Sequence, residues 1–250
     1  MVDDLVPDLI ENIKRDFNIE FKKNKKINKI QKLINDGTAT YKEAHIYSIE
    51  VGDILAKILN KHISMDALPD GRMYYNIAER ILNTTLGENH RLIVKATLQI
   101  QELLNKNAGL GLKGIEVPLH SEKINSLINR ISSEEKFEEI SWMLDEPVVT
   151  FSQNVVDEMI KANIEFQAKS GMKPTVTREV SGHDPCDWCR NLSGKYEYPN
   201  VPADVYRRHD RCRCIVEYKP SENKKQNVWS KDWLTNEEKN KVELRKTYGL

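Results

Sequence analysis

The distribution of cysteine constrains this chain more than any other feature of its sequence. All four cysteines lie between Cys186 and Cys214, and none precedes this segment in a chain of 250 residues. A secreted protein with a disulfide framework would spread its bridges through the fold, whereas clustered cysteines in a cytosolic chain indicate metal or redox chemistry. The sequence therefore predicts a metal or redox site near the C-terminal end.

The composition narrows the class of protein. Hydrophobic residues make up 39% and charged residues 30%, which favours a helical protein with much solvated surface over a thick α/β enzyme core. Lys plus Arg equals Asp plus Glu at 38 each, so any contact with nucleic acid has to come from a local patch. No apolar run approaches the ~20 residues of a membrane span, and the acidic N-terminus is not expected to be a signal peptide.

The N-terminal part has the apolar spacing of α-helices from Leu5 to Ser170. The first helix is expected over Leu5–Ile34, because Asn35-Asp36-Gly37 is a strong turn signal. Thr40 and Glu43 have the spacing of a capping box, which predicts that a second helix begins there.

Further helix signals follow along the chain. Periodic apolar residues predict helices over Tyr74–Asn83 and Glu88–Lys106, and Ser121 and Ser132 are expected to be N-caps. A last apolar stripe runs over residues 148–166 and is expected to end at a left-handed Gly171.

The pattern changes near Pro174. Strands are expected over residues 175–180, 195–198 and 213–218. After a polar linker, a final helix is expected to open at Thr235. The predicted fold class is therefore mainly α, with a multi-helix body over residues 1–172 and a small α+β Cys/His zinc-binding domain over residues 173–220. Residues 221–250 are expected to form the linker and the C-terminal helix.

The cysteine spacing predicts a zinc site. Zinc takes four N or S ligands in a tetrahedron, so neighbouring ligand atoms lie ~4 Å apart. Cys186-x2-Cys189 reaches that distance in a tight turn. Cys212 and Cys214 would stand ~6.5 Å apart on an extended strand. Either the chain bends between them or His209 replaces one of them, so one zinc is expected on four of these five residues.

Two other readings of the cysteines remain open. They are a reversible disulfide or redox pair, although the βαβ context of such motifs is missing, and plain buried thiols. Trp188, between the first two cysteines, is expected to pack around the site rather than to act in it.

Two motifs in this region resemble a known family. Ser181–Cys189, followed by Leu192-Ser193-Gly194, and Pro202–Cys214 are similar to the C-terminal end of phage head-morphogenesis proteins, the Mu protein F-like minor head family. Those proteins show Cys-x2-Cys, a Leu-x-Gly turn, and His-x2-Cys-Arg-Cys before a final strand. Residues 35–101 also resemble the helical part of such proteins from prophages of Gram-positive bacteria. One departure is Asp210-Arg211, where the family often has Pro-Asn.

The resemblance implies a structural and assembly role rather than an enzyme. Such a minor head protein of a tailed bacteriophage is expected in the virion, inside the capsid near the portal, and in the host cytoplasm during assembly. Its expected partners are the portal, the major capsid protein or both, with packaged DNA as a further candidate. No membrane and no small-molecule substrate are expected, and the zinc is expected to be structural.

A zinc-dependent enzyme is the alternative reading. Pro185-Cys186-x2-Cys189 and His120-Ser121-Glu122 match the two halves of the zinc deaminase signature, in which zinc activates a water and the glutamate moves protons. The halves lie far apart in the chain, and this reading gives Cys212 and Cys214 no purpose. A nuclease using His209 and Asp210 is a comparable alternative.

A basic stripe is the candidate for contact with nucleic acid. Lys22, Lys25, Lys29 and Lys32 recur at helical spacing, opposite the apolar Ile27, Ile30 and Ile34. Phosphates of packaged DNA can bind along such a stripe. The favoured interpretation is nevertheless an amphipathic helix with a solvated lysine face.

Overall fold

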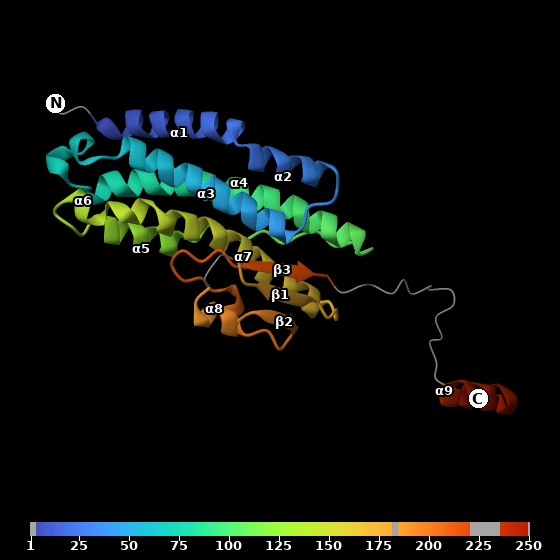
Figure 1. The fold of residues 1–250 in the computed structure, drawn as a ribbon. Coiled ribbons are helices and arrows are strands. Elements are labelled where there is room, and N and C mark those ends of the chain that lie inside the picture. Colours follow the sequence, from blue (N-terminus) through green and yellow to red (C-terminus); the bar gives the residue numbers. More distant parts are fainter. Residues whose placement is uncertain (1–3, 182–184, 221–235, 250) are drawn as a thin grey trace.

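The computed structural model describes residues 4–181, 185–220 and 236–249. Long helices lie side by side in a bundle, and a small sheet packs against one side of it, next to α7 (Figure 1). The predicted fold class, mainly helical with a small C-terminal sheet region that carries the Cys/His cluster, is confirmed. No helix among the described residues is long and apolar enough to cross a membrane.

The helices of the bundle surround a central α3. Their bounds are α1 (Leu5–Lys23), α2 (Lys25–Asn35), α3 (Tyr41–His62), α4 (Tyr75–Asn107), α5 (Ser121–Ile131), α6 (Phe137–Ile140) and α7 (Glu146–Lys169). Short 3-10 turns lie at Met65–Ala67, Pro69–Gly71 and Ser141–Leu144. Helix α3 contacts α1, α2, α4 and α7, and the buried apolar side chains form one continuous core.

Two local predictions in the bundle are confirmed. The capping box of α3 is present: the Glu43 carboxylate accepts from the Thr40 backbone N–H at 2.8 Å, and the Thr40 hydroxyl oxygen accepts from the Lys42 N–H at 3.2 Å. Helix α7 ends at Lys169 with Ser170 as its C-cap, and Gly171 has the left-handed conformation, φ 79°, that glycine adopts without a steric penalty.

The prediction of one helix over Leu5–Ile34 is wrong. Asn24 has extended backbone angles between α1 and α2. Its side-chain oxygen accepts from the N–H groups of Lys26 and Ile27 at 2.9 and 3.0 Å, which caps α2. Its amide nitrogen donates to Glu50 on α3 at 2.9 Å. Because Asn24 satisfies the free amides of a new helix, the chain can turn there without losing hydrogen bonds.

The prediction of separate helices over residues 74–83 and 88–106 is also wrong, because α4 runs through both without a break. The joining segment contains Thr85 and Gly87, which are weak helix formers. Thr85 is buried and donates its hydroxyl to the Ile81 carbonyl at 2.8 Å, and Leu86 is fully buried. Tertiary packing therefore overrides the local preference.

The two serine N-caps are misplaced. Ser121 is the first residue of α5, and His120 stands at the cap position without a side-chain hydrogen bond. Ser132 stands at the C-terminal end of α5 and donates to the Ile128 carbonyl at 2.8 Å. The Ser132 hydroxyl therefore bonds to a carbonyl at the end of α5 and does not cap the start of another helix.

The sheet follows the three predicted strands. β1 (Thr175–Glu179) lies in the middle, and β2 (Gly194–Glu197) and β3 (Ile215–Lys219) pair with it antiparallel on either side. Between β1 and β3 lie α8 (Asp187–Asn191) and a 3-10 turn, Ala203–Tyr206. Side chains of β1 and β3 are buried in the same core as the bundle. The division between residues 172 and 173 stays a prediction.

The C-terminal helix α9 spans Asn236–Tyr248 and has no buried residue. Its expected cap, Thr235, and the expected linker over residues 221–226 lie outside the described residues.

Candidate metal centre

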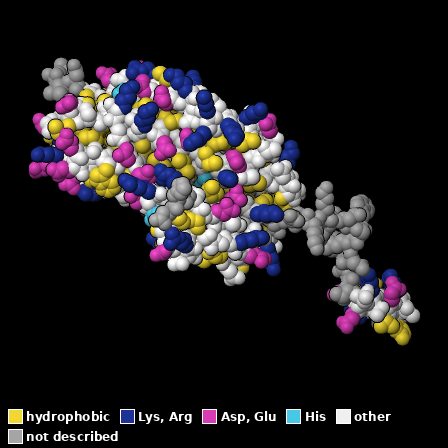
Figure 2. Space-filling view, viewed as in Figure 1, with side chains coloured by type: hydrophobic (Ala, Val, Ile, Leu, Met, Phe, Trp, Pro, Cys, Tyr) yellow, Lys and Arg dark blue, Asp and Glu magenta, His cyan; other side chains and the backbone are white. Residues whose placement is uncertain are grey.

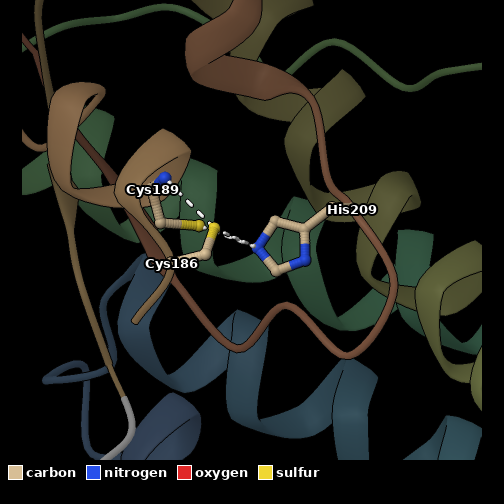
Figure 3. A group of neighbouring side chains, drawn as sticks. All are labelled: Cys186, Cys189 and His209. Carbon is tan, nitrogen blue, oxygen red and sulfur yellow. Dashed lines mark hydrogen bonds between the residues drawn. The ribbon is translucent and has the colours of Figure 1, made fainter. Parts of the chain in front are cut away.

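The two cysteine motifs meet at one place beside the sheet. Cys186 caps α8, and its sulfur accepts from the Cys189 N–H at 3.5 Å. The second motif lies in the loop between the 3-10 turn and β3. Figure 3 shows the sulfurs of Cys186 and Cys189 and the imidazole of His209 pointing toward one another. Cys189, Cys212 and Cys214 are buried, whereas Cys186 and His209 are exposed.

The distances suit a shared metal ion. His209 Nε2 lies 3.3 Å from Cys186 Sγ and 3.0 Å from Cys189 Sγ. Cys189 Sγ lies 3.9 Å from Cys212 Sγ, and the ligand atoms of Cys189, Cys212 and Cys214 all lie within 4.8 Å of one another. Tetrahedral zinc with bonds of about 2.3 Å to sulfur needs ligand atoms ~4 Å apart. The donor set and its spacing therefore fit a metal ion such as zinc.

All five predicted ligands lie in this cluster, and Cys189 belongs to both of its overlapping groups. The Cys212–Cys214 segment precedes β3, so it is not held in an extended strand. A turn closes before it: the Cys212 N–H donates to the His209 carbonyl at 3.2 Å, and Arg211 has φ 55°. The chain thus bends before the second cysteine pair and also brings His209 to the cluster. Which four residues bind stays a prediction.

The thiols differ in acidity because they bond to one another. A hydrogen bond from Cys212 lowers the pKa of Cys214 to about 7, and the same contact, with burial, raises the pKa of Cys212 to about 12. Burial raises the pKa of Cys189. A metal replaces these protons, since the thiolate is the form that coordinates.

His209 is oriented for coordination through Nε2. Its Nδ1 lies 2.6 Å from the carbonyl oxygen of Asp210, so Nδ1–H donates there and leaves the Nε2 lone pair free. A backbone carbonyl on the far ring nitrogen is a common way to fix the tautomer of a metal-binding histidine. The Trp188 ring and the imidazole pack edge to face, with ring centroids 5.8 Å apart.

A buried ion pair fixes the same loop to the bundle. Arg208 donates to both carboxylate oxygens of Asp157 on α7, at 2.5 and 2.9 Å. The Arg208 guanidinium also donates to the Cys214 carbonyl at 2.8 Å and to Nδ1 of His45 on α3 at 3.1 Å. Burial holds the pKa of His45 well below its ordinary value, so the ring is neutral. Its Nε2–H donates to the Val216 carbonyl at 2.9 Å.

Arg178 on β1 lies behind the cysteines. It is only 1% exposed, and its guanidinium donates to the sulfurs of Cys189 and Cys212 at 3.8 and 3.7 Å. Neither this arginine nor the His45–Asp157–Arg208 network was anticipated from the sequence. These residues come from elements far apart in the chain, and no single motif contains them together, although Arg208 lies within the Pro202–Cys214 motif.

His120 and Glu122, the other half of the deaminase signature, lie outside the cysteine cluster. His120 Nε2 pairs with Glu158 on α7 at 3.1 Å, and neither His120 nor Glu122 belongs to a group of potential ligands among the described residues. Asp210 is exposed, and its carboxylate lies 3.9 Å from Arg211. The two halves of the deaminase signature are thus not brought together at the cysteines.

The predicted lysine stripe is divided by the break at Asn24. Lys22 lies on α1, whereas Lys25, Lys29 and Lys32 lie on α2, and all four are exposed. The opposite face of α2 is buried through Ile27, Ile30 and Ile34, as expected of an amphipathic helix. Figure 2 shows basic side chains mixed with acidic and apolar ones on the face in view. Binding of DNA by these lysines stays a prediction.

Comparisons with models of protein families, with curated proteins and with solved structures find nothing that matches this chain.

Proposed function

We propose that this protein is a minor head protein of a tailed bacteriophage, a structural component that assists head assembly and carries one zinc ion. The observation that supports the proposal is the meeting of Cys186-x2-Cys189 with the His209–Cys214 segment in one cluster. These are the two motifs on which the resemblance to the phage family rests. A shared metal site would explain why both motifs occur in the same chain.

The proposed zinc is structural. Such a site is closed, with all four positions taken by protein atoms, and its binding energy stabilises the fold. The buried Cys189, Cys212 and Cys214 would supply three ligands, and Cys186 or His209 the fourth. The site would hold α8 and the His209–Cys214 loop to the sheet, while Arg208 holds the same loop to the bundle.

The proposed place of the protein is inside the capsid near the portal. The proposed partners are the portal or the major capsid protein, with packaged DNA as a further candidate through Lys22, Lys25, Lys29 and Lys32.

Mass spectrometry of purified virions tests the role. The chain is expected in DNA-filled particles in few copies. In a complementation assay in the parent phage, Cys212→Ser is expected to lower incorporation of the protein or the yield of infectious particles. The matched control is Glu122→Gln, which alters an exposed residue outside the cluster and is expected to leave both unchanged. Particles that lack the chain would contradict the assembly role.

A zinc-dependent hydrolase is the second candidate, and one observation favours it. A groove of about 630 Å³ lies between α5, α7 and the His209-Asp210 loop. Trp142 and Phe151 are among its apolar lining residues, and the exposed candidate ligand His209 also lines it. Loss of infectivity in Asp210→Asn or Glu122→Gln, with normal incorporation, would favour this enzyme over the structural role.

A further inference from the structure

The two terminal nitrogens of Arg178 bond to groups around the cysteines, whereas its buried Nε has no hydrogen-bond partner. Nη1 donates to the carbonyls of Val205 and Arg207 at 2.5 and 3.0 Å. Nη2 donates to the sulfurs of Cys189 and Cys212 at 3.8 and 3.7 Å. The guanidinium also lies over the Trp188 ring, 5.3 Å from its centroid. One planar group thus touches the loop, α8 and two of the candidate ligands.

No carboxylate among the described residues contacts the Arg178 guanidinium directly, although the buried Asp157 interacts with it through its charge. The Asp157 carboxylate is itself bonded by Arg208. An arginine stays charged in proteins, and burying an unpaired ion is strongly unfavourable. The sulfurs of Cys189 and Cys212 are the groups in contact with it that can carry negative charge.

A metal–thiolate centre supplies that negative charge. A divalent ion bound by three cysteines and a histidine leaves one net negative charge, and four cysteines leave two. With either ligand set, the negative charge of the centre balances the positive charge of Arg178, whereas neutral thiols carry no charge to balance it. Hard ions such as Mg²⁺ prefer oxygen ligands, so the counter-charge belongs with a thiolate-preferring ion such as zinc.

We propose that Arg178 is the positioning residue of the metal centre: it balances the charge of the metal-bound thiolates and fixes Cys189 and Cys212 by N–H···S hydrogen bonds. This inference rests on the proposed zinc centre. It adds that the affinity for the metal depends on a residue that does not coordinate it.

The experiment compares full-length wild type with Arg178→Met, Arg178→Lys and the control Arg207→Met. Arg207 is an exposed arginine of the same region that pairs with Asp204 at 3.0 Å. The first readout is transfer of bound zinc to a competing chelator. Outer-shell partners of metal ligands are worth about 10- to 100-fold in metal affinity. We expect that loss in Arg178→Met, a smaller loss in Arg178→Lys, and none in Arg207→Met.

The second readout is the sulfur-to-metal charge-transfer band of the cobalt-substituted proteins. N–H···S bonds stabilise the sulfur lone pairs, so losing them shifts the band to longer wavelength. We expect this shift in both Arg178 variants and not in Arg207→Met. A general loss of stability does not move the band of a centre that is still formed.

The outcomes separate this inference from the zinc centre itself. Wild type that binds no zinc and no cobalt contradicts the centre and, with it, the role of Arg178. Wild type that binds metal, with Arg178 variants of the same zinc retention and the same band, overturns the role of Arg178 alone.

If both Arg178 variants fail to fold, wild type loaded with ¹¹³Cd decides. Scalar coupling between cadmium and the Arg178 guanidinium protons is the expected result, because the coupling passes through the N–H···S bonds. Its absence overturns the inference.

Discussion

At the scale of single residues, buried polar groups hold the His209–Cys214 loop of the candidate metal centre in place. His45, Asp157 and Arg208 come from α3, α7 and the loop, and their side chains are at most 1% exposed. Their hydrogen bonds reach the backbone of Cys214 and Val216. The loop that carries the second cysteine pair is therefore fixed by polar contacts from the bundle as well as by its own turn.

The neutral state of His45 makes stability depend on pH. Burial lowers the pKa of His45 below the value of about 6.5 that it has in the unfolded chain. Above that pH both states are neutral. As the pH falls below it, the unfolded state takes up a proton that the folded state does not. The free energy of unfolding is therefore expected to fall by up to about 1.4 kcal/mol per pH unit from this residue.

Urea unfolding of wild type and His45→Gln between pH 7 and pH 5 measures this effect. The free energy of unfolding is expected to change less with pH in the variant, because the glutamine takes up no proton. Metal and carboxylate contributions are common to both proteins and cancel in the difference. Equal slopes would show that His45 titrates normally in the fold.

Asp157→Asn is expected to be strongly destabilising. It leaves the buried charge of Arg208 without its partner, which costs about 3–5 kcal/mol in comparable buried pairs. The neighbouring Glu158 is a matched control, because its pairs with Lys123 and His120 are partly exposed. Glu158→Gln is expected to cost about 1 kcal/mol or less. Similar unfolding free energies for the two variants would contradict the assigned role of the Asp157–Arg208 pair.

Candidate ligands were predictable at this scale, whereas their supports were not. Cysteine and histidine at short spacings predict a metal site because that pattern is typical of metal ligands. Arg178 sits inside an alternating strand pattern and looks like any exposed arginine. The chain position of Asp157 on an apolar helix gives no sign that Arg208 will neutralise it.

At the scale of elements, α3 and α7 approach each other closely at Gly52. A Cβ on Gly52 would lie 2.9 Å from both the Val149 Cα and the Ser152 Oγ. The first of these atoms is backbone and cannot move alone. Glycine at this position therefore lets α3 and α7 pack closely. The space beside Gly52 is tighter than the space beside Gly87 of α4.

Two glycine-to-alanine substitutions are expected to change stability in opposite directions. Gly87→Ala places a Cβ 3.8 Å from the Leu119 side chain, an ordinary contact, and removes a flexible residue from α4. It is expected to stabilise the protein by up to about 1 kcal/mol. Gly52→Ala is expected to destabilise it by about 1–3 kcal/mol through overpacking. Thermal unfolding of the two variants checks the signs, and stabilisation by Gly52→Ala would contradict the close packing.

The three strands and the start of α3 were predictable from sequence because local patterns determine them. The alternation in Thr175–Glu179 and the capping box at Thr40 specify structure within a few residues. The break at Asn24 and the continuity of α4 depend on contacts with other helices, which no local pattern contains.

At the scale of the whole molecule, one hydrophobic core joins the helical bundle to the small sheet, and the candidate metal centre lies beside that sheet. Chelation is expected to remove the zinc and the folding free energy that its binding supplies. In small zinc modules that free energy is on the order of 10 kcal/mol. Residues 174–220 are then expected to become accessible to protease, while the helical circular-dichroism signal of the bundle largely persists. If the bundle unfolds together with the sheet, the predicted division near residue 172 is wrong.

The zinc content of the protein purified without chelator shows whether the proposed metal centre exists. We expect about one zinc per chain in the wild type, loss of the zinc in Cys189→Ser and Cys212→Ser, and its retention in one of Cys186→Ser and His209→Ala. The variant that also loses its zinc identifies the fourth ligand. Wild-type protein with four titratable thiols and a zinc content near zero would contradict the account.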